Sequence, residues 1–173
     1  MSKRLSYEHP LICRYVSQEM SYVWSPQMKF STWRNLWITL ASAQKSLGLE
    51  ISQEQIDEMK KNVNNIDFDL AAKMENNFKH DVMAHIHTFG EICPNAKPII
   101  HLGATSCYVG DNTELIQIKE SLCIIYNKLI PLLKIMSEFA LKYKDLPTLG
   151  FTHFQPAQLL SLIHISEPTR LSL

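Results

Sequence analysis

The stretch NTELIQIKESLCIIYNKLIPLLKIMSEFALKYK, from Asn112 to Lys144, is the most regular part of this sequence. Its large apolar residues recur in alternating steps of three and four, which places them along one side of an α-helix. The pattern lasts four heptads and predicts one long helix, with Asp111 and Glu114 as a cap-and-box pair at its start. We name this apolar line the heptad seam, and its residues are Leu115, Ile118, Leu122, Ile125, Leu129, Leu132, Met136, Phe139 and Tyr143.

The heptad seam also predicts what must surround this helix. At 1.5 Å per residue, a helix from Asn112 to Lys144 is roughly 50 Å long. The segments before it are short helices and loops, which cannot cover a seam of that length. We therefore expect the seam to pack against helices that this chain lacks, from further sequence or from other subunits. Pro131 lies off the seam, so it should kink the helix without ending it.

Residues typical of helix starts also occur in the sequence before the heptad seam. Ser25 offers an N-cap with Pro26 at the first helical position, and Gly48 stands where a C-terminal cap belongs. Ser52 and Gln55 match a capping box, which predicts a second, shorter helix. The N-terminal part of the chain is therefore expected to consist of short helices.

A third helix is expected after Asp67, which can serve as its N-cap. We expect a break near His80, before the helical pattern continues to Cys93-Pro94. Residues 95–110 have no helical period and are predicted to form a loop. The resulting fold class is all-α, with a domain of short helices over residues 1–106 and the start of a helical bundle over residues 107–158.

Composition excludes several classes of protein. The chain has 173 residues, of which 46% are apolar and 20% charged, so it is not expected to be disordered. It carries 17 basic and 17 acidic side chains, which argues against nucleic acid or an anionic membrane as the main partner. No apolar run is long enough to span a bilayer. We expect a cytoplasmic protein without a zinc site or a disulfide framework, because no regular spacing relates its cysteines, Cys13, Cys93, Cys107 and Cys123.

The histidines are the first candidates for chemistry. His85 and His87 lie about 200° apart on a helix, so they cannot share a metal ion, and no metal site is expected. His85 should instead pack on the buried side of its helix. His80 lies at the expected break, where its side chain can face a cleft. His153 lies beyond the long helix, where a loop histidine can act as an acid or a base.

A hydroxyl pair follows His101 in the segment HLGATS. Thr105, Ser106 and the backbone amides of this turn can hold a carboxylate or a phosphate, because loop amides and helix N-termini point donors outward. The alternative is that one of the two hydroxyls only caps a helix.

Three motifs in this order resemble the adenylosuccinate lyase family of the animal type, within the fumarase/aspartase superfamily. They are KHDVMAHIHTFG (Lys79–Gly90), IIHLGATSCYVGDNTELI (Ile99–Ile116) and LPTLGFTHFQPAQ (Leu146–Gln158). The resemblance runs from about Tyr7 to Gln158 and includes CRYVSQEM (Cys13–Met20) and FSTWRNLW (Phe30–Trp37). It implies an N-terminal fragment that contains the family's N-terminal helical domain and the first long helix of its central bundle.

The resemblance implies a β-elimination without a metal or an organic cofactor. Such lyases release fumarate from adenylosuccinate, giving AMP, and from the succinyl-aminoimidazole carboxamide ribotide of purine biosynthesis. Two catalytic histidines are implied, His153 as general acid to the leaving nitrogen and His80 as a second active-site histidine. The implied substrate-binding residues are Arg14 and Tyr15 at the phosphate end, Lys79 and Asp81 beside His80, Thr105 and Ser106 at a succinyl carboxylate, and Thr152 beside His153.

The sequence departs from this family in one important respect. The family's loop of the form SSxMPxKxNP, which carries the serine base, is absent from these 173 residues. Family members assemble their active sites as homotetramers, so this chain alone is expected to be inactive. The alternative reading is a catalytically dead helical module that associates with full-length subunits. Residues 159–173 are set apart from the fold, because LIHISEPTR resembles translated adapter sequence; a natural splice-variant tail is the alternative.

Overall fold

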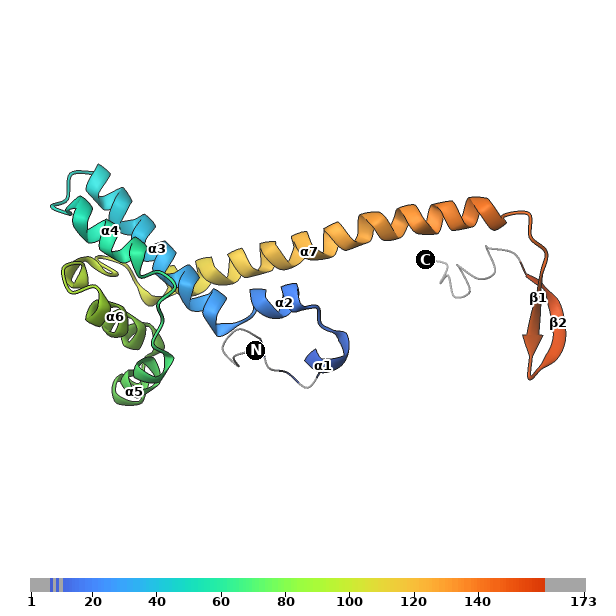
Figure 1. The fold of residues 1–173 in the computed structure, drawn as a ribbon, viewed down its shortest axis with the longest axis horizontal. Coiled ribbons are helices and arrows are strands. Elements are labelled where there is room, and N and C mark those ends of the chain that lie inside the picture. The colour runs from blue at the N-terminus through green and yellow to red at the C-terminus, as the bar shows by residue number, and fades with distance from the viewer. Residues whose placement is uncertain (1–6, 8, 10, 161–173) are drawn as a thin grey trace. The chain divides into compact units, whose positions relative to one another are not determined.

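The computed structural model describes Tyr7, His9 and residues 11–160, which divide into two compact units, Met1–Ile124 and Ile125–Leu173 (Figure 1). The adapter-like stretch lies outside the described residues. In chain order the elements are α1 (Ile12–Tyr15), α2 (Gln18–Val23), α3 (Pro26–Ser46), α4 (Gln53–Lys61), α5 (Phe68–Phe78), α6 (Asp81–Ile92), the 3-10 helix η2 (Lys97–Ile99), α7 (Ser106–Tyr143), β1 (Thr148–Thr152) and β2 (Gln155–Leu160).

The predicted starts of α3, α4 and α5 are confirmed. The Ser25 hydroxyl accepts a hydrogen bond from the Met28 amide at 3.2 Å, and Gly48 follows α3 with φ of +94°. Ser52 and Gln55 form the reciprocal capping box at the start of α4. The Asp67 carboxylate likewise accepts from the amide of the third residue of α5. Side-chain caps readable from the sequence therefore set most boundaries in the first unit.

The core of the first unit is built on two tryptophans one turn apart on α3. Trp33 and Trp37 are each 1% exposed. Around them pack apolar side chains from α4, α6, the segment between α6 and α7, and the first turn of α7, among which are Ile56, Met59, Val82, Phe89, Cys93, Ile99 and Val109. Burial of this aromatic stripe holds α3, α4 and α6 together.

A buried arginine on α3 was not predicted from the sequence. Arg34 is 1% exposed, and its Nη1 donates to the carbonyls of Asn62 at 2.6 Å and Asn65 at 2.7 Å. Its guanidinium carbon lies 4.3 Å from the Phe89 ring centroid. Burial lowers its pKa to about 10, so the group stays charged at neutral pH and fixes the chain after α4 to α3.

Helix α7 is longer than predicted. It begins at Ser106 rather than near Asn112, so Asp111 and Glu114 lie inside it and the predicted cap-and-box pair at its start is wrong. Because Gly110 tolerates a helical backbone, residues 106–110 continue the helix despite their lack of an apolar period. Pro131 lies inside the helix without ending it, as predicted.

The beginning of α7 is joined to the helices before it by polar contacts. The Gln117 amide donates to the Val23 carbonyl at 2.6 Å, and the Trp24 indole donates to the Ser121 hydroxyl at 3.0 Å. The Tyr108 hydroxyl donates to the Leu36 carbonyl at 3.1 Å. These bonds place the first turns of α7 against α2 and α3.

The heptad seam is uncovered among the described residues. From Leu115 to Phe139 its residues are 46% to 65% exposed, and Tyr143 at its end is partly buried. Off the seam, Tyr126, Leu133 and Ile135 are also more than half exposed. A helix that is apolar on several sides is typical of a bundle interior. In the part of the chain that the structure describes, no helix is long and apolar enough to cross a membrane.

A β-hairpin follows α7 and was not predicted. Strands β1 and β2 pair antiparallel, with Thr152 opposite Gln155 and a register shift after Gly150. The two residues of the turn, His153 and Phe154, have φ of +49° and +62°. Positive φ at both turn positions is the geometry that two-residue hairpins favour, although neither residue is a glycine. The helical class holds, with this hairpin as an addition.

We predict that the purified chain self-associates through the heptad seam. Replacing Leu122 and Leu129 by Lys should raise the dissociation constant of the assembly by roughly tenfold or more per site, because each buried leucine contributes ~1.5–3 kcal/mol. Sedimentation of the wild-type and substituted chains measures this. Asn127→Lys, a similar change at an exposed position off the seam, is the control, and a wild-type chain that sediments as a monomer would contradict the prediction.

Candidate functional site

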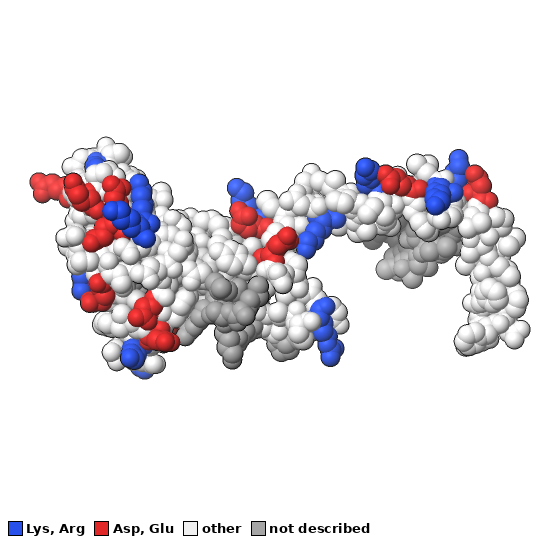
Figure 2. Space-filling model, in the orientation of Figure 1, with Lys and Arg blue, Asp and Glu red and all other residues white. Residues whose placement is uncertain are grey.

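A pocket of about 510 Å³ lies where the first turns of α3, α6 and α7 meet. It is lined by three residues that the sequence predicted as site residues, His80, Asp81 and Ser106. We call it the α3/α6/α7 pocket. Acidic and basic side chains are interspersed over the face seen in Figure 2 rather than gathered by sign, so the chemistry of this pocket depends on its own few charged groups.

His80 lies in the pocket because it is the N-cap of α6. Lys79 ends α5 in the left-handed region with φ of +54°, and His80 is extended, so the chain turns sharply between the two helices. The His80 Nδ1 accepts from the Met83 amide at 3.4 Å and lies 3.7 Å from Asp81 Oδ1. Because Nδ1 accepts, the neutral ring carries its proton on Nε2. The predicted break is confirmed, with His80 as the cap.

The loop before α7 is tied to the core by His101. The Trp37 indole donates to His101 Nδ1 at 2.9 Å, and the Gln44 side chain donates to the Leu102 carbonyl at 2.8 Å. His101 and Gly103 both have positive φ, at 64° and 70°. Burial lowers the pKa of His101, and the nearby charge of protonated His80 lowers it further.

Only one of the two hydroxyl residues predicted in the segment HLGATS lines the pocket. Ser106 is the first residue of α7 and lines the α3/α6/α7 pocket. Thr105 directly precedes it, is exposed, and accepts a backbone hydrogen bond from Tyr108. Lys79 is exposed and, like Thr105, does not line the pocket.

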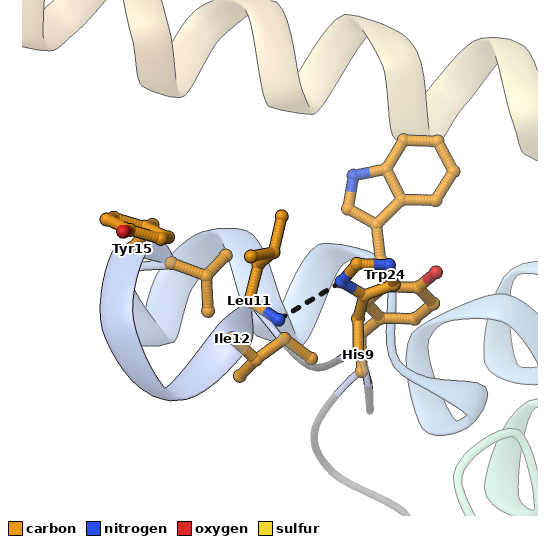
Figure 3. A pocket seen from close by; sticks show the side chains of 7 residues that line it. His9, Leu11, Ile12, Tyr15 and Trp24 are labelled. Carbon is orange, nitrogen blue, oxygen red and sulfur yellow. Dashed lines mark hydrogen bonds between the residues drawn. The ribbon is translucent and has the colours of Figure 1, made fainter.

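Tyr15, the last residue of α1, lines a second pocket of about 420 Å³ (Figure 3), and Arg14 precedes it on the same helix. Tyr15 is 76% exposed and stands at one end of this pocket, while Trp24 stands at the other with His9 beside it. Tyr7 and Trp24 line both pockets, so the two adjoin. Arg14 is exposed and lines neither.

Thr152 and His153 belong to the second unit and are described there by themselves. Thr152 is the last residue of β1 and pairs with Gln155, and His153 is the first residue of the two-residue turn. Both side chains are exposed. The turn leaves the His153 imidazole in solvent.

His85 packs behind the pocket, as predicted. It is 4% exposed, stacks on Phe30 with ring centroids 3.7 Å apart, and meets Trp33 edge-on at 5.5 Å. Burial is the main cause that lowers its pKa to about 4, and the charge of Arg34 acts in the same direction. The ring is therefore neutral at physiological pH and serves packing.

Sequence reasoning missed the residues that α3 contributes to the pocket. Lys29 and Trp33 both line it, and the Lys29 ammonium lies 5.2 Å from the Trp33 ring centroid. They are four residues apart on a helix whose start at Pro26 was predicted, so their shared face was readable. Nothing in the sequence indicated that this face would meet α6 and α7.

Comparison with known proteins gives close relatives over most of the chain. No protein-family model matches it. Adenylosuccinate lyase from Saccharomyces cerevisiae is 52% identical over 160 residues, which cover 91% of this chain and 33% of that enzyme. The enzyme from Schistosoma mansoni is 48% identical over 152 residues, and that from Methanocaldococcus jannaschii 36% over 152 residues. The chain thus spans about a third of the length of these relatives.

Solved structures share the fold. Beta-carboxy-cis,cis-muconate cycloisomerase from Acinetobacter calcoaceticus superposes with a TM-score of 0.75 at 21% identity, covering 91% of this chain and 38% of that one. The 3-carboxy-cis,cis-muconate lactonizing enzyme from Pseudomonas putida gives 0.76 at 22% identity, covering 90% and 36%. The described part of the chain therefore shares its fold with about a third of each of these two enzymes.

We predict that His85 makes the stability of the first unit depend on pH. A folded-state pKa of about 4, below the ordinary 6.5, means that below pH 6.5 the unfolded chain binds a proton that the folded chain does not. The His85 contribution is therefore complete above pH 6.5 and is lost as the pH falls toward 4, by roughly 3 kcal/mol in total.

Urea unfolding between pH 4 and pH 7 measures this dependence. His85→Phe keeps an aromatic ring in the stack but cannot titrate, so its free energy of unfolding should fall less steeply with acid. His87→Phe, on the same helix, is the control and should keep the wild-type slope. Equal slopes for the wild type and His85→Phe would show that His85 does not titrate in this way.

Proposed function

We propose that this chain, a homologue of adenylosuccinate lyases over about a third of their length, is part of an enzyme that releases fumarate from adenylosuccinate and from the succinyl-aminoimidazole carboxamide ribotide. One observation carries the proposal: the adjacent residues His80 and Asp81 line a single pocket with Ser106, which is distant from them in the sequence. We place the enzyme in the cytoplasm, with a nucleotide as its partner and without nucleic acid or membrane.

The reaction needs a base, an acid and groups that bind the substrate. A base removes the proton from the succinyl carbon next to a carboxylate, and the electron pair forms the double bond of fumarate as the carbon–nitrogen bond breaks. We assign His153 as the acid that protonates the leaving nitrogen, because its imidazole is exposed on a tight turn and histidine is the side chain that most often transfers protons in catalysis. The base belongs to the serine-bearing loop, which this chain lacks.

The remaining predicted residues take binding roles. Thr105 and Ser106 would hold a succinyl carboxylate, with Ser106 in the pocket and Thr105 before it. Asp81 and Lys79 flank His80, and Thr152 stands beside His153. Arg14 and Tyr15 would contact the phosphate end of the nucleotide. The second pocket supports this, because Tyr15 lines it and it adjoins the α3/α6/α7 pocket.

We propose that the enzyme is a homotetramer in which the heptad seam packs against other helices. The exposed fractions of the seam residues, 46% to 65% from Leu115 to Phe139, support a partner at this surface. The same observation favours the second candidate function, a catalytically inactive helical module that joins full-length subunits. Turnover in an assembled chimera distinguishes the two.

The proposed function predicts that His153 is needed for turnover. In a chimera, residues of this chain replace the matching third of the Saccharomyces cerevisiae enzyme, which supplies the rest. Replacing His153 by Ala should lower kcat by ~10²–10⁴-fold, the usual effect of losing a general acid. The loss of adenylosuccinate absorbance measures turnover. His87→Ala, a histidine outside the pocket, is the control.

A chimera that assembles but releases no fumarate would contradict the proposed function. An active His153→Ala chimera would contradict the assignment of the acid.

A second prediction concerns Arg14. Replacing it by Met in the same chimera should raise KM and leave kcat nearly unchanged, because a phosphate contact remote from the reacting bond acts equally in the ground and transition states. The loss of one charged hydrogen bond corresponds to roughly tenfold or more in KM. Lys60→Met on α4 is the matched control. If kcat fell and KM stayed constant, Arg14 would not be a phosphate contact.

A further inference from the structure

Two buried hydrogen-bonding atoms at the α3/α6/α7 pocket have no partner in the part of the chain that the structure describes. They are the Trp33 indole Nε1 and the Thr113 hydroxyl, on residues that are each 1% exposed and that both line the pocket. Buried polar groups in native proteins nearly always have a partner. Arg34 Nη2 and Gln44 Oε1 are also buried without a partner, but those residues do not line this pocket. The observation that points to an acceptor here is that two orphan donors belong to residues of one pocket.

The other two tryptophans show that this is specific to Trp33. The Trp24 indole donates to the Ser121 hydroxyl at 3.0 Å, and the Trp37 indole donates to His101 at 2.9 Å. The Trp33 ring is held by Phe30 at 5.0 Å and by His85 at 5.5 Å, both edge-on. Its orientation is therefore set by packing, and it cannot turn to find another acceptor without disturbing the core.

Lys29 brings a positive charge to the same place. It is half-buried, its ammonium lies 5.2 Å from the Trp33 ring centroid, and it is the only Lys or Arg among the described residues that line the pocket. The pocket's carboxylates, those of Asp81, Asp111 and Glu114, belong to exposed residues. Positive charge and unpaired donors thus lie on the buried side, and the negative charges lie toward solvent.

We infer that Lys29, Trp33 and Thr113 form a carboxylate-binding subsite for the dicarboxylate portion of the substrate. The ammonium supplies the charge, and the indole N–H and the hydroxyl donate to carboxylate oxygens. Hydrogen bonds to a charged acceptor are the stronger kind. This inference rests on the proposed function for the identity of the ligand, and it adds three residues of α3 and α7 to the site.

Binding of labelled fumarate to the full chain by equilibrium dialysis tests the subsite, because dialysis counts bound ligand per chain whether or not chains associate. The wild-type chain should bind fumarate saturably, with a Kd on the order of 1 mM. Lys29→Met should weaken fumarate binding about tenfold or more, and Lys29→Arg should restore most of it. Lys60→Met removes an exposed charge from α4 and should bind fumarate like the wild type.

Thr113→Val separates a binding role from a structural one. The substitution keeps the shape of the side chain and removes only a hydroxyl that has no partner in the folded chain. We expect the midpoint of thermal unfolding to stay the same or rise, while fumarate binding weakens by about threefold or more. A lower unfolding midpoint with unchanged fumarate binding would mean that the hydroxyl serves the fold and would overturn its place in the subsite.

A comparison of fumarate with AMP tests whether the subsite recognises carboxylates. AMP carries a phosphate but no succinyl carboxylates, so its binding should respond to Lys29→Met less than fumarate binding does. An equal loss for AMP, or fumarate binding that is absent or unaffected by Lys29→Met, overturns the inference. These results are independent of turnover: His153→Ala should leave fumarate binding intact, so failure of the proposed function and failure of the subsite give different outcomes.

Discussion

The packing of Trp33 and Trp37 one turn apart on α3 is the constraint on which the first unit depends. The two rings are almost fully buried, and they meet α6 through His85 and Phe89. The same side chains reach the functional surface, since Trp37 fixes His101 by a hydrogen bond and Trp33 lines the α3/α6/α7 pocket. Core and site therefore share one aromatic stripe, and neither can shift without the other.

Local chemistry explains which parts of the fold were predictable. A serine before a proline, a capping box and an aspartate cap each act within four residues, so their helix starts could be read directly from the sequence. The hairpin after α7 depends on a turn with positive φ at His153 and Phe154, which lacks the usual glycine or asparagine signal. The burial of Arg34 depends on carbonyls 28 and 31 residues away, and no local pattern records such a distance.

The same distinction between local signals and long-range packing applies to the candidate site. His80 and Asp81 could be placed at a helix start, and Ser106 in a turn, yet only the folded chain brings the starts of α6 and α7 to one pocket. The motifs suggested which residues matter because they resemble a family, and not because their spacing implied proximity. Lys29 and Thr113 belong to regular helices and carry no motif, so their position at the pocket required the structure.

The hairpin turn lowers the conformational entropy that the chain loses when a ligand binds at His153. A histidine in an open loop loses backbone freedom when it engages a partner, at ~1–2 kcal/mol for each residue that becomes fixed. The backbone of His153 is already confined between Thr152 and its paired residue, Gln155, so folding has met that entropic cost in advance. Only rotation of the imidazole about its side-chain bonds is left to be lost, and the free energy of an encounter at this residue goes into contacts rather than into ordering the chain.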